Sequence, residues 1–315
     1  MSVRLASRCI VFSATAAIVF ILFTPYIQAQ DCHTAHAPTA LKAMQENADA
    51  GDADSQCGLG KQYEYGLGVS QDNKQAALWL QKSAEQGDVR AQVELGVVFD
   101  KMQDYVQALI WYRKAADQGN ARAQYNLGLC YQNGESVAKD VLQAIAWYRK
   151  AADQGDTLAQ NNLAVIYDQG AGIPQDYSQA AYWYRKAAEQ GLAEAQYGLG
   201  YLYLHGNGVP KDEIQATTWM RKAAEQGQTF AQFNLGACYL NGAGVELDLK
   251  EGYFWILLAH TRTPDVGLKE HAEETLGKLS RVMKKSEIKS AEKRAQDWLK
   301  RHPLKTGAVP SGVAG

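Results

Sequence analysis

Apolar side chains recur along this chain with a helical spacing that sits inside a longer repeat. Glycine stands at 51, 87, 119, 155, 191 and 227. Successive glycines are separated by 36 residues, except for one interval of 32. If that glycine is position 1, positions 5, 9 and 13 form an apolar stripe, as Ala159, Leu163 and Tyr167 do in the fourth repeat. Because side chains four residues apart share one face of an α-helix, the pattern predicts an amphipathic first helix in each repeat.

A second helix is predicted in the latter half of each repeat. Its start is marked by Asp followed three residues later by Gln or Glu, as in Asp176 and Gln179. This resembles a capping box, in which the carboxylate accepts backbone N–H groups and the longer side chain reaches back. Each second helix also carries a Trp at position 29, once a four-residue deletion in the second repeat is allowed for, and ends at the next glycine. The capping residues are Asp72, Asp104, Asp140, Asp176, Asp212 and Asp248, and the Trp residues are Trp79, Trp111, Trp147, Trp183, Trp219 and Trp255.

Such helix pairs contain too little core to be stable alone, so they are expected to stack. Position 10 is Gly in five repeats and Ala164 in the fourth, which lets another helix approach closely. Residues 40–49, 266–283 and 287–300 are predicted as end helices, with Ser286 as the N-cap of the last. We therefore expect an all-α protein, a right-handed α-solenoid of six helix-turn-helix repeats with helical end caps.

The repeat A-x-A-Q-x-x-L-G-x-x-Y…G-x-G-V-x-x-D…A-x-x-W-Y-x-K-A-A-E-Q resembles the Sel-1-like repeat, a relative of the tetratricopeptide repeat. Residues 51–262 carry six copies, and the second has Asp100-Lys101-Met102-Gln103 in place of the G-x-G-V turn. These motif positions are structural and carry little information on function. Bacterial members of the family are typically exported or cytosolic scaffolds that hold proteins or peptides, some linked to envelope maintenance or host contact. The resemblance implies a role of that kind.

Residues 1–29 have the order of a secretory signal peptide. Arg4 and Arg8 precede an apolar run from Ile10 to Phe23, and Ala29 offers a small residue for cleavage. The alternative is a retained N-terminal membrane anchor, although the run is shorter than the roughly 20 residues that a spanning helix needs. We expect a periplasmic or secreted mature protein without a membrane span. Its parts are then a lead-in and capping helix (30–50), the repeats (51–262), the C-terminal capping helices (263–302) and a flexible tail (303–315).

Charge argues against nucleic acid as a partner. The chain has 32 basic and 34 acidic residues, a net charge of -2, and no basic footprint for a phosphate backbone. The distribution is uneven, because residues 266–305 hold 11 basic and 6 acidic residues. Apart from two arginines in the leader, the remainder holds 19 basic and 28 acidic residues. An acidic repeat array favours a neutral or basic partner, although salt screens exposed charges.

Cysteine is too sparse for a disulfide-dense scaffold. Cys9 leaves with the leader, and export places the remaining four in an oxidising compartment. The helix at 40–49 is expected to fold back against the first helix of the first repeat, which brings Cys32 towards Cys57. We predict a Cys32–Cys57 disulfide, whereas Cys130 and Cys238 lie three repeats apart and cannot meet.

Two motifs that suggest ligand binding have plainer structural interpretations. The G-x-G turns, such as Gly206-Asn207-Gly208, recur between helices and lack the third glycine and preceding strand of a phosphate loop. Cys32, His33 and His36 form a small ligand-like group, but structural zinc sites usually show four well-spaced ligands. We therefore expect no metal and no cofactor.

A third motif suggests an enzyme. Ser-x-x-Lys occurs at Ser136/Lys139, Ser286/Lys289 and Ser290/Lys293, and Lys305-Thr306-Gly307 matches a second motif of penicillin-recognising enzymes. Some disulfide-rich relatives of the repeat family have been proposed to bind or hydrolyse β-lactams, so a β-lactam-binding or cell-wall-acting hydrolase is the alternative function. That chemistry needs Lys-Thr-Gly on a strand beside a pocket, whereas here it falls in the predicted tail. We expect the chain not to be an enzyme.

The repeats also predict where a partner binds. In related tetratricopeptide arrays the first helices line the concave face, and this geometry assigns positions 4, 7, 11 and 14–15 to a groove. Those positions differ between repeats, whereas the core positions do not, and asparagines at position 8 can bond a peptide backbone. The predicted partner-binding residues are Arg122, Tyr125, Asn126, Asn162, Tyr197, Tyr201, Phe233 and Asn234.

The alternative for this set is structural: the aromatic side chains pack between successive first helices, and the asparagines satisfy local backbone groups. Large rigid side chains flanked by amides are nevertheless typical of protein-binding surfaces. The predicted function is an exported, non-enzymatic scaffold that acts as a monomer and binds a protein or peptide through these first helices.

Overall fold

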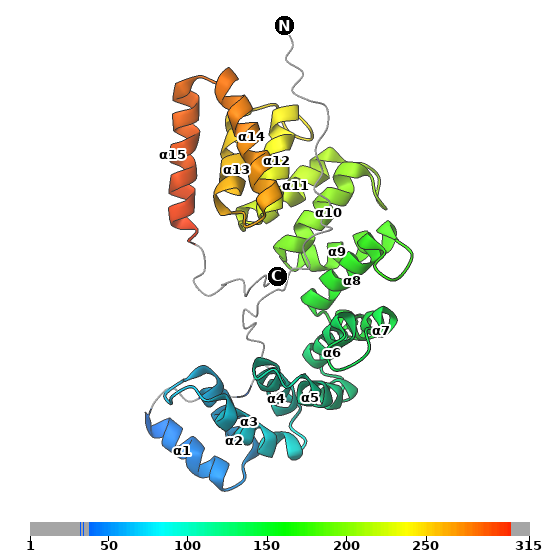
Figure 1. Ribbon diagram of the computed structural model, residues 1–315, viewed down its shortest axis with the longest axis vertical. Coiled ribbons are helices and arrows are strands. Elements are labelled where there is room, and N and C mark those ends of the chain that lie inside the picture. The colour runs from blue at the N-terminus through cyan, green and yellow to red at the C-terminus, as the bar shows by residue number, and fades with distance from the viewer. Residues whose placement is uncertain (1–31, 33, 35–37, 304–315) are drawn as a thin grey trace. The chain divides into compact units, whose positions relative to one another are not determined.

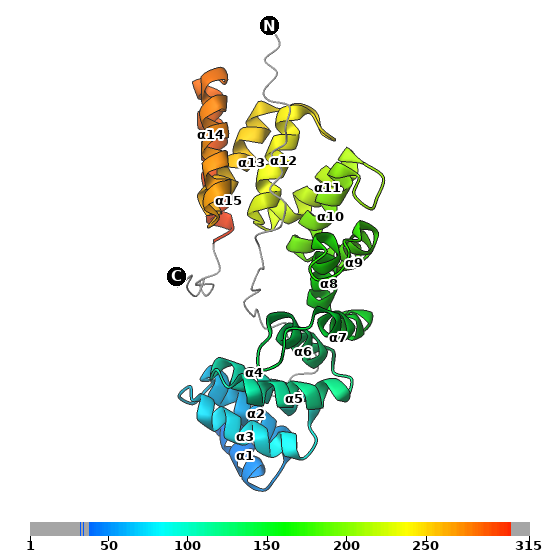
Figure 2. The same cartoon turned by 45° about the vertical axis from the view of Figure 1, so that its right-hand side comes forward.

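The computed structural model describes residues 32, 34 and 38–303 as α-helices and the turns that join them (Figure 1). Helices that follow one another in the chain pack against each other, which makes an α-solenoid, as predicted (Figures 1 and 2). Within the described residues the helices are α1 (Pro38–Asp49), α2 (Ala53–Tyr65), α3 (Asn73–Glu85), α4 (Val89–Lys101), α5 (Tyr105–Asp117), α6 (Ala121–Asn133), α7 (Val141–Asp153), α8 (Thr157–Gln169), α9 (Tyr177–Glu189), α10 (Ala193–His205), α11 (Glu213–Glu225), α12 (Thr229–Asn241), α13 (Leu249–Arg262), α14 (Val266–Val282) and α15 (Lys285–Arg301).

The repeats account for α2 to α13, with the first helices even-numbered and the second helices odd-numbered. The chain divides into two compact units. The N-terminal unit contains the described residues up to Leu163 together with Ala171–Ile173, and the C-terminal unit contains Ala164–Gly170 and the described residues from Pro174 onward. Within the described residues, no helix combines the length and the hydrophobicity that crossing a membrane requires.

Every second helix begins at its predicted Asp cap. The carboxylate of Asp176, for example, accepts the backbone N–H groups of Ser178 at 2.9 Å and Gln179 at 3.0 Å. The N–H of the cap itself donates to the carbonyl at position 13, as Asp176 does to Tyr167 at 2.9 Å. Because that donor is already satisfied, the Gln of the expected capping box is not needed, and among the described residues Gln179 makes no bond back to the cap.

The small residue at position 10 lets the two helices of a repeat touch. A Cβ atom on Gly128 would lie 2.6 Å from the Tyr148 ring, and one on Gly96 would lie 2.5 Å from the Tyr112 ring. Both distances are shorter than real Cβ contacts, so the second helix rests directly on the backbone of the first. The position-9 leucines beside these glycines, such as Leu127, are fully buried, as the apolar stripe predicts.

Glutamine side chains tie the end of each second helix to the first helix of the same repeat. In the N-terminal unit, Gln154 Nε2 donates to Gln124 Oε1 at 2.8 Å and to the Gly119 carbonyl at 2.9 Å. The same arrangement recurs in the C-terminal unit, where Gln226 Nε2 donates to Gln196 Oε1 at 2.8 Å. These bonds satisfy polar groups that stacking would otherwise bury without partners.

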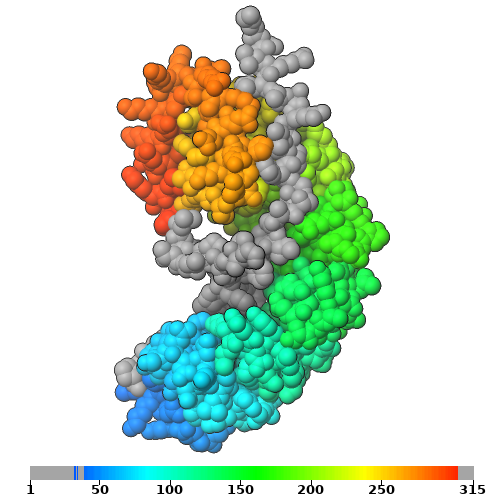
Figure 3. Space-filling model, viewed as in Figure 1, coloured from blue at the N-terminus to red at the C-terminus, as the bar shows by residue number. Residues whose placement is uncertain are grey.

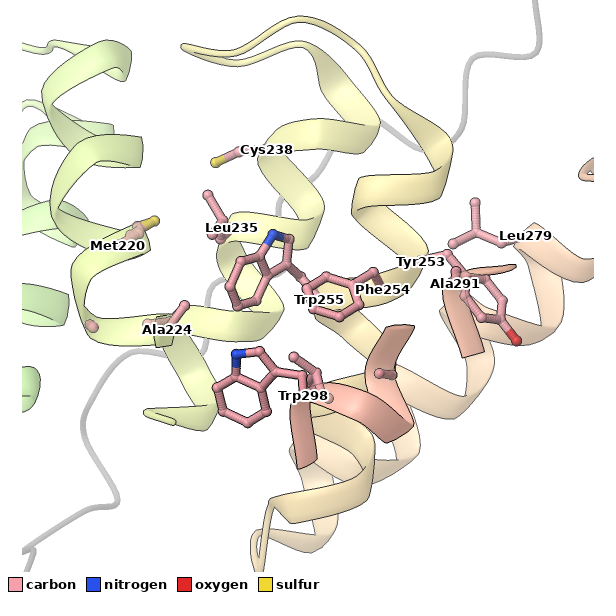
Figure 4. Close-up of a cluster of buried hydrophobic side chains, with 14 of the residues drawn as sticks. Met220, Ala224, Leu235, Cys238, Tyr253, Phe254, Trp255, Leu279, Ala291 and Trp298 are labelled. Carbon is pink, nitrogen blue, oxygen red and sulfur yellow. The ribbon is translucent and has the colours of Figure 1, made fainter. Parts of the chain in front are cut away.

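The last repeat is covered by α14 and α15, which form the orange and red surface beside it in Figure 3. Trp298 of α15 points into the same apolar cluster as Trp255 of α13 (Figure 4). The predicted cap at Ser286 is wrong, because α15 begins at Lys285 after the cap residue Lys284. Glu287 determines this start, since its carboxylate accepts the Lys284 N–H at 3.1 Å.

Candidate partner-binding surface

The residues predicted to contact a partner all lie on first helices, and they fall into one set in each unit. The set of the N-terminal unit is Arg122, Tyr125 and Asn126 on α6 with Asn162 on α8. The set of the C-terminal unit is Tyr197 and Tyr201 on α10 with Phe233 and Asn234 on α12.

In the N-terminal set, Tyr125 and Asn162 are partly exposed. The Tyr125 ring lies 5.8 Å from the Tyr148 ring. Burial raises the pKa of the Tyr125 hydroxyl, and the Asn162 side chain opposes that rise. Asn126 is only 4% exposed, and its Nδ2 has no hydrogen-bond partner among the described residues. Tyr125 and Asn162 are therefore the accessible pair, and Asn126 lies beneath the surface.

Arg122 belongs to a charged network that the sequence analysis did not anticipate. Its guanidinium donates to Glu94 Oε1 at 2.7 Å, and Lys61 Nζ donates to the same oxygen at 3.0 Å. Beside this group, Lys101 Nζ lies 2.7 Å from Glu64 Oε1. The two carboxylates are almost fully buried, with Glu64 at 0% and Glu94 at 1% exposed.

The charges of this network compensate one another. Burial raises the pKa of Glu64 and the nearby Glu94 charge raises it further, while Lys101 lowers it. Each carboxylate also keeps one buried oxygen, Oε2, without a hydrogen-bond partner in the described structure. The signal in the sequence was charge at positions 8 and 11 of first helices, at Glu94 and Lys61, where other repeats carry glycine, apolar, tyrosine or amide residues.

Tyr197, in the C-terminal set, packs between first helices. It is 4% exposed, its ring lies 6.1 Å from the Phe230 ring, and its hydroxyl accepts a hydrogen bond from Asn234 Nδ2 at 3.1 Å. Position 7 of one repeat therefore meets positions 4 and 8 of the next. Phe233 is 8% exposed and belongs to an apolar cluster with Leu268 of α14.

Tyr201 is the member of this set that remains partly exposed. Its ring stacks on His205 with 4.2 Å between centroids and lies 6.4 Å from the Tyr197 ring. In the same unit, Asp168 of α8 accepts a long hydrogen bond of 3.5 Å from the Tyr184 hydroxyl, and the Tyr184 ring lies against Gly198 of α10. Burial raises the pKa of Asp168 to about 6, and the hydrogen bond from Tyr184 lowers it in part.

Less of the predicted set reaches the surface than the groove geometry implied. Tyr197, Phe233, Asn126 and Asn234 are buried, whereas Arg122, Tyr125, Asn162 and Tyr201 are partly exposed. Tyr197 and Asn234 are buried because they bond to each other across neighbouring first helices, and Phe233 is buried because it packs against α14. The buried four support the surface, and the partly exposed four form it.

The motifs associated with catalysis and metals are dispersed. Ser136 lies in the turn between α6 and α7, whereas Ser286 and Ser290 lie on α15. Residues 305–307, as well as His33 and His36, lie outside the described residues. Within the described residues, no group of three or more His, Cys, Asp or Glu side chains is placed to hold a metal ion.

The structure joins Cys32 to Cys57 in a disulfide, with the Cα atoms 5.5 Å apart. Cys57 is fully buried on α2, close to Leu80 of the first repeat's second helix. Cys130 and Cys238 are buried in different units. Burial raises the pKa of the Cys130 thiol to about 12, which makes it a poor nucleophile.

Two solved structures resemble this one over most of the chain. A protective antigen present in uropathogenic Escherichia coli strains, which displays an SLR fold, is 36% identical over 88% of the chain with a TM-score of 0.76. The chain spans 61% of that antigen's length. A Sel1 repeat protein from Oxalobacter formigenes is 31% identical over 75% of this chain and 69% of its own, with a TM-score of 0.64. A comparison with curated proteins gave no match.

A family profile agrees with the repeats seen in the structure. The profile described as Sel1 repeat matches residues 53–88, 89–120, 121–156, 157–192, 193–228 and 229–259. Each match contains one first helix and the second helix of the same repeat, except that the last match ends three residues before the end of α13. With six matches that span more than half of the sequence, the chain belongs to the Sel1 repeat family.

Proposed function

We propose that this chain is an exported, non-enzymatic scaffold that binds protein or peptide partners through the first helices of its repeats. One observation carries the proposal: the residues that the repeats share are used in packing and capping, while positions 4, 7 and 11 of the first helices differ from repeat to repeat. The shared Leu, Gly, Trp and Asp residues leave no common reactive group at the surface. A solenoid that varies one face over a constant core is suited to recognition.

The contact residues we propose are the partly exposed ones. Tyr125, Asn162 and Arg122 form the contact surface of the N-terminal unit, and Tyr201 forms that of the C-terminal unit. Aromatic rings and guanidinium groups are enriched among residues that dominate binding energy. Tyr197 and the other buried members hold these side chains in place, so Tyr197→Ala should cost roughly 3–5 kcal/mol of stability and is unsuitable as a binding variant.

Export is the second part of the proposal. The leader order at residues 1–29 and a disulfide between Cys32 and Cys57 both suit an oxidising compartment. The similar E. coli protein is a protective antigen, which also suits an exported chain. Intact mass of the protein recovered from a cell envelope or medium fraction tests this part, because removal of the leader and formation of the disulfide both change the mass.

Site-specific photo-cross-linking tests the binding surface. p-Benzoylphenylalanine replaces Tyr201 or Tyr125 in the full chain. The variant is expressed in the cells that naturally make this protein. The matched controls replace Tyr182 on α9 or Tyr105 on α5, which are exposed tyrosines on second helices of neighbouring repeats. We expect specific protein adducts from the first-helix positions and none from the controls. Adducts at the controls alone, or none at all, would contradict the proposed surface.

A separate measurement tests the absence of enzyme activity. The chain is expected to leave the chromogenic β-lactam nitrocefin intact. Turnover that disappears in the Ser136→Ala variant would favour the hydrolase instead, since Ser136 heads the Ser-x-x-Lys match in the turn between α6 and α7.

A further inference from the structure

Asp168, at position 14 of the fourth repeat, carries a carboxylate that no cation of the described residues neutralises. Its one hydrogen bond is the long contact of 3.5 Å from the Tyr184 hydroxyl to Oδ2. No Lys, Arg or His in the described part of the chain forms an ion pair with it. The pKa of Asp168 is raised to about 6 by burial, which still leaves the group ionised at neutral pH. A charge held in this way lacks an internal counter-ion.

Tyr184 connects this charge to α10. Its hydroxyl contacts Asp168 Oδ2, and its ring lies against Gly198 of α10, where a Cβ atom would be 2.7 Å away. Tyr197 precedes Gly198 directly and Tyr201 follows it by one turn, and the Asp168 charge raises the pKa values of all three tyrosines. Among these three, Tyr201 is partly exposed, whereas Tyr184 and Tyr197 are buried. The faces of tyrosine rings carry negative potential and attract cations. A partly exposed ring beside an uncompensated carboxylate therefore prefers a positively charged group.

Other repeats satisfy the carboxylate at position 14 internally. In the first repeat, Glu64 pairs with Lys101 at 2.7 Å. In the second repeat, Asp100 Oδ2 accepts a short hydrogen bond of 2.6 Å from Tyr112, and its Oδ1 is buried beyond the reach of a partner. Neither carboxylate oxygen of Asp168 is both fully buried and without a hydrogen-bond partner. Its missing counter-ion can therefore come from outside the chain.

We propose that Asp168 and the ring of Tyr201 bind one lysine or arginine side chain of a peptide partner, an inference that rests on the proposed function. The ammonium or guanidinium group pairs with the open carboxylate oxygen and lies against the face of the Tyr201 ring opposite His205, on which the other face stacks. Tyr197, packed behind and hydrogen-bonded by Asn234, fixes the position of that ring. The excess of acidic residues outside the C-terminal segment adds attraction for a basic segment.

Small amino-acid amides test the site without knowledge of the partner. The probes are Nα-acetyl-lysine amide and Nα-acetyl-arginine amide, and their neutral twins are the norleucine and citrulline amides. The full chain carries 13C-labelled tyrosine, and the Tyr201 ring resonance is assigned by its loss in Tyr201→Phe. We expect the two cations to shift that resonance saturably, and the neutral twins to leave it in place.

Variants then assign the effect to the carboxylate. Asp168→Asn should weaken cation binding by at least about fivefold, because it removes the charge and keeps the shape. Asp100→Asn removes a carboxylate at the same repeat position. The Oδ1 atom of Asp100 is buried and cannot reach a ligand, so this variant should leave binding unchanged. Equal shifts with the neutral twins, equal binding by Asp168→Asn, or no shift with either cation would overturn the cation site.

The two proposals fail separately. Cross-links at the Tyr125 and Tyr201 positions with no cation response would leave the scaffold function standing and reject the cation site. Cation binding without any cross-linked protein would reject the proposed function. The cation site would then exist, but its role in binding a peptide partner would be rejected.

Discussion

Replacing Asp168 by Asn should stabilise the protein at neutral pH. The carboxylate is partly buried without a cation, so its pKa rises from 3.8 to about 6 on folding. The folded state therefore binds this proton more tightly than the unfolded chain does, and the stability contribution falls as the pH rises from about 4 to about 6. Above pH 6 the penalty is fully present. Asn does not titrate and can still accept the hydrogen bond from Tyr184.

The size of the effect follows from the shift. Each pKa unit corresponds to about 1.4 kcal/mol, so a shift from 3.8 to about 6 sets an upper bound of roughly 3 kcal/mol. Asp168 retains some contact with solvent, which screens its charge, and about 1–2 kcal/mol is the expected gain for Asp168→Asn at pH 7.5. At pH 4 the gain should almost vanish, because the carboxyl group is then largely protonated in the folded protein.

Urea titrations followed by far-ultraviolet circular dichroism at pH 4, 5, 6 and 7.5 measure the difference. Asp297→Asn, which removes an exposed carboxylate on α15, controls for the change in net charge. A destabilised Asp168→Asn protein at pH 7.5, or a gain that does not depend on pH, would refute the reasoning. Either result would mean that the folded protein already supplies a counter-ion or a strong donor to Asp168.

Further predictions concern the repeat scaffold. Gly128→Ala should cost roughly 1–3 kcal/mol in urea titrations because its Cβ atom meets a tyrosine ring at 2.6 Å, whereas Gly277→Ala, with open space around it, should gain about 0.5–1 kcal/mol. Asp176→Ala should cost about 1 kcal/mol through loss of its cap, and an unchanged urea midpoint would contradict that role. Alkylation of unfolded, unreduced protein should modify neither Cys32 nor Cys57, and four modified thiols in the mature chain would exclude the bond.

The fold was predictable because the same capping and packing residues recur at the same positions of each repeat. Asp caps, Trp at position 29 and glycine at position 10 recur in register, so an accidental match at one site is corrected by the others. The start of α15 was not predictable in this way, because it is not part of the repeat. There Ser286 was the attractive cap, and the choice of Lys284 depends on the backward hydrogen bond to Glu287.

The binding residues were only partly predictable, because variability does not measure exposure. Tyr197 and Tyr201 lie four residues apart on α10 and differ between repeats in the same way. Only the structure separates them: Tyr197 meets the neighbouring first helix, and Tyr201 remains partly exposed. Asp168 escaped notice for a related reason. An acidic residue near the end of a helix looks like ordinary solvent-facing charge until the burial around it is known.

Position 14 shows how a solenoid gives equivalent sites different tasks. Glu64 is neutralised by Lys101, Asp100 is closed by a tyrosine hydroxyl, and Gln132 accepts the corresponding hydrogen bond at 2.6 Å without any charge. All three lie in the N-terminal unit and need nothing from outside. Asp168, in the C-terminal unit, has the same geometry but only a long bond from its tyrosine. Since the backbone is the same at each site, we expect selectivity along this array to depend on where a charge is left uncompensated, because a basic partner would gain most by binding there.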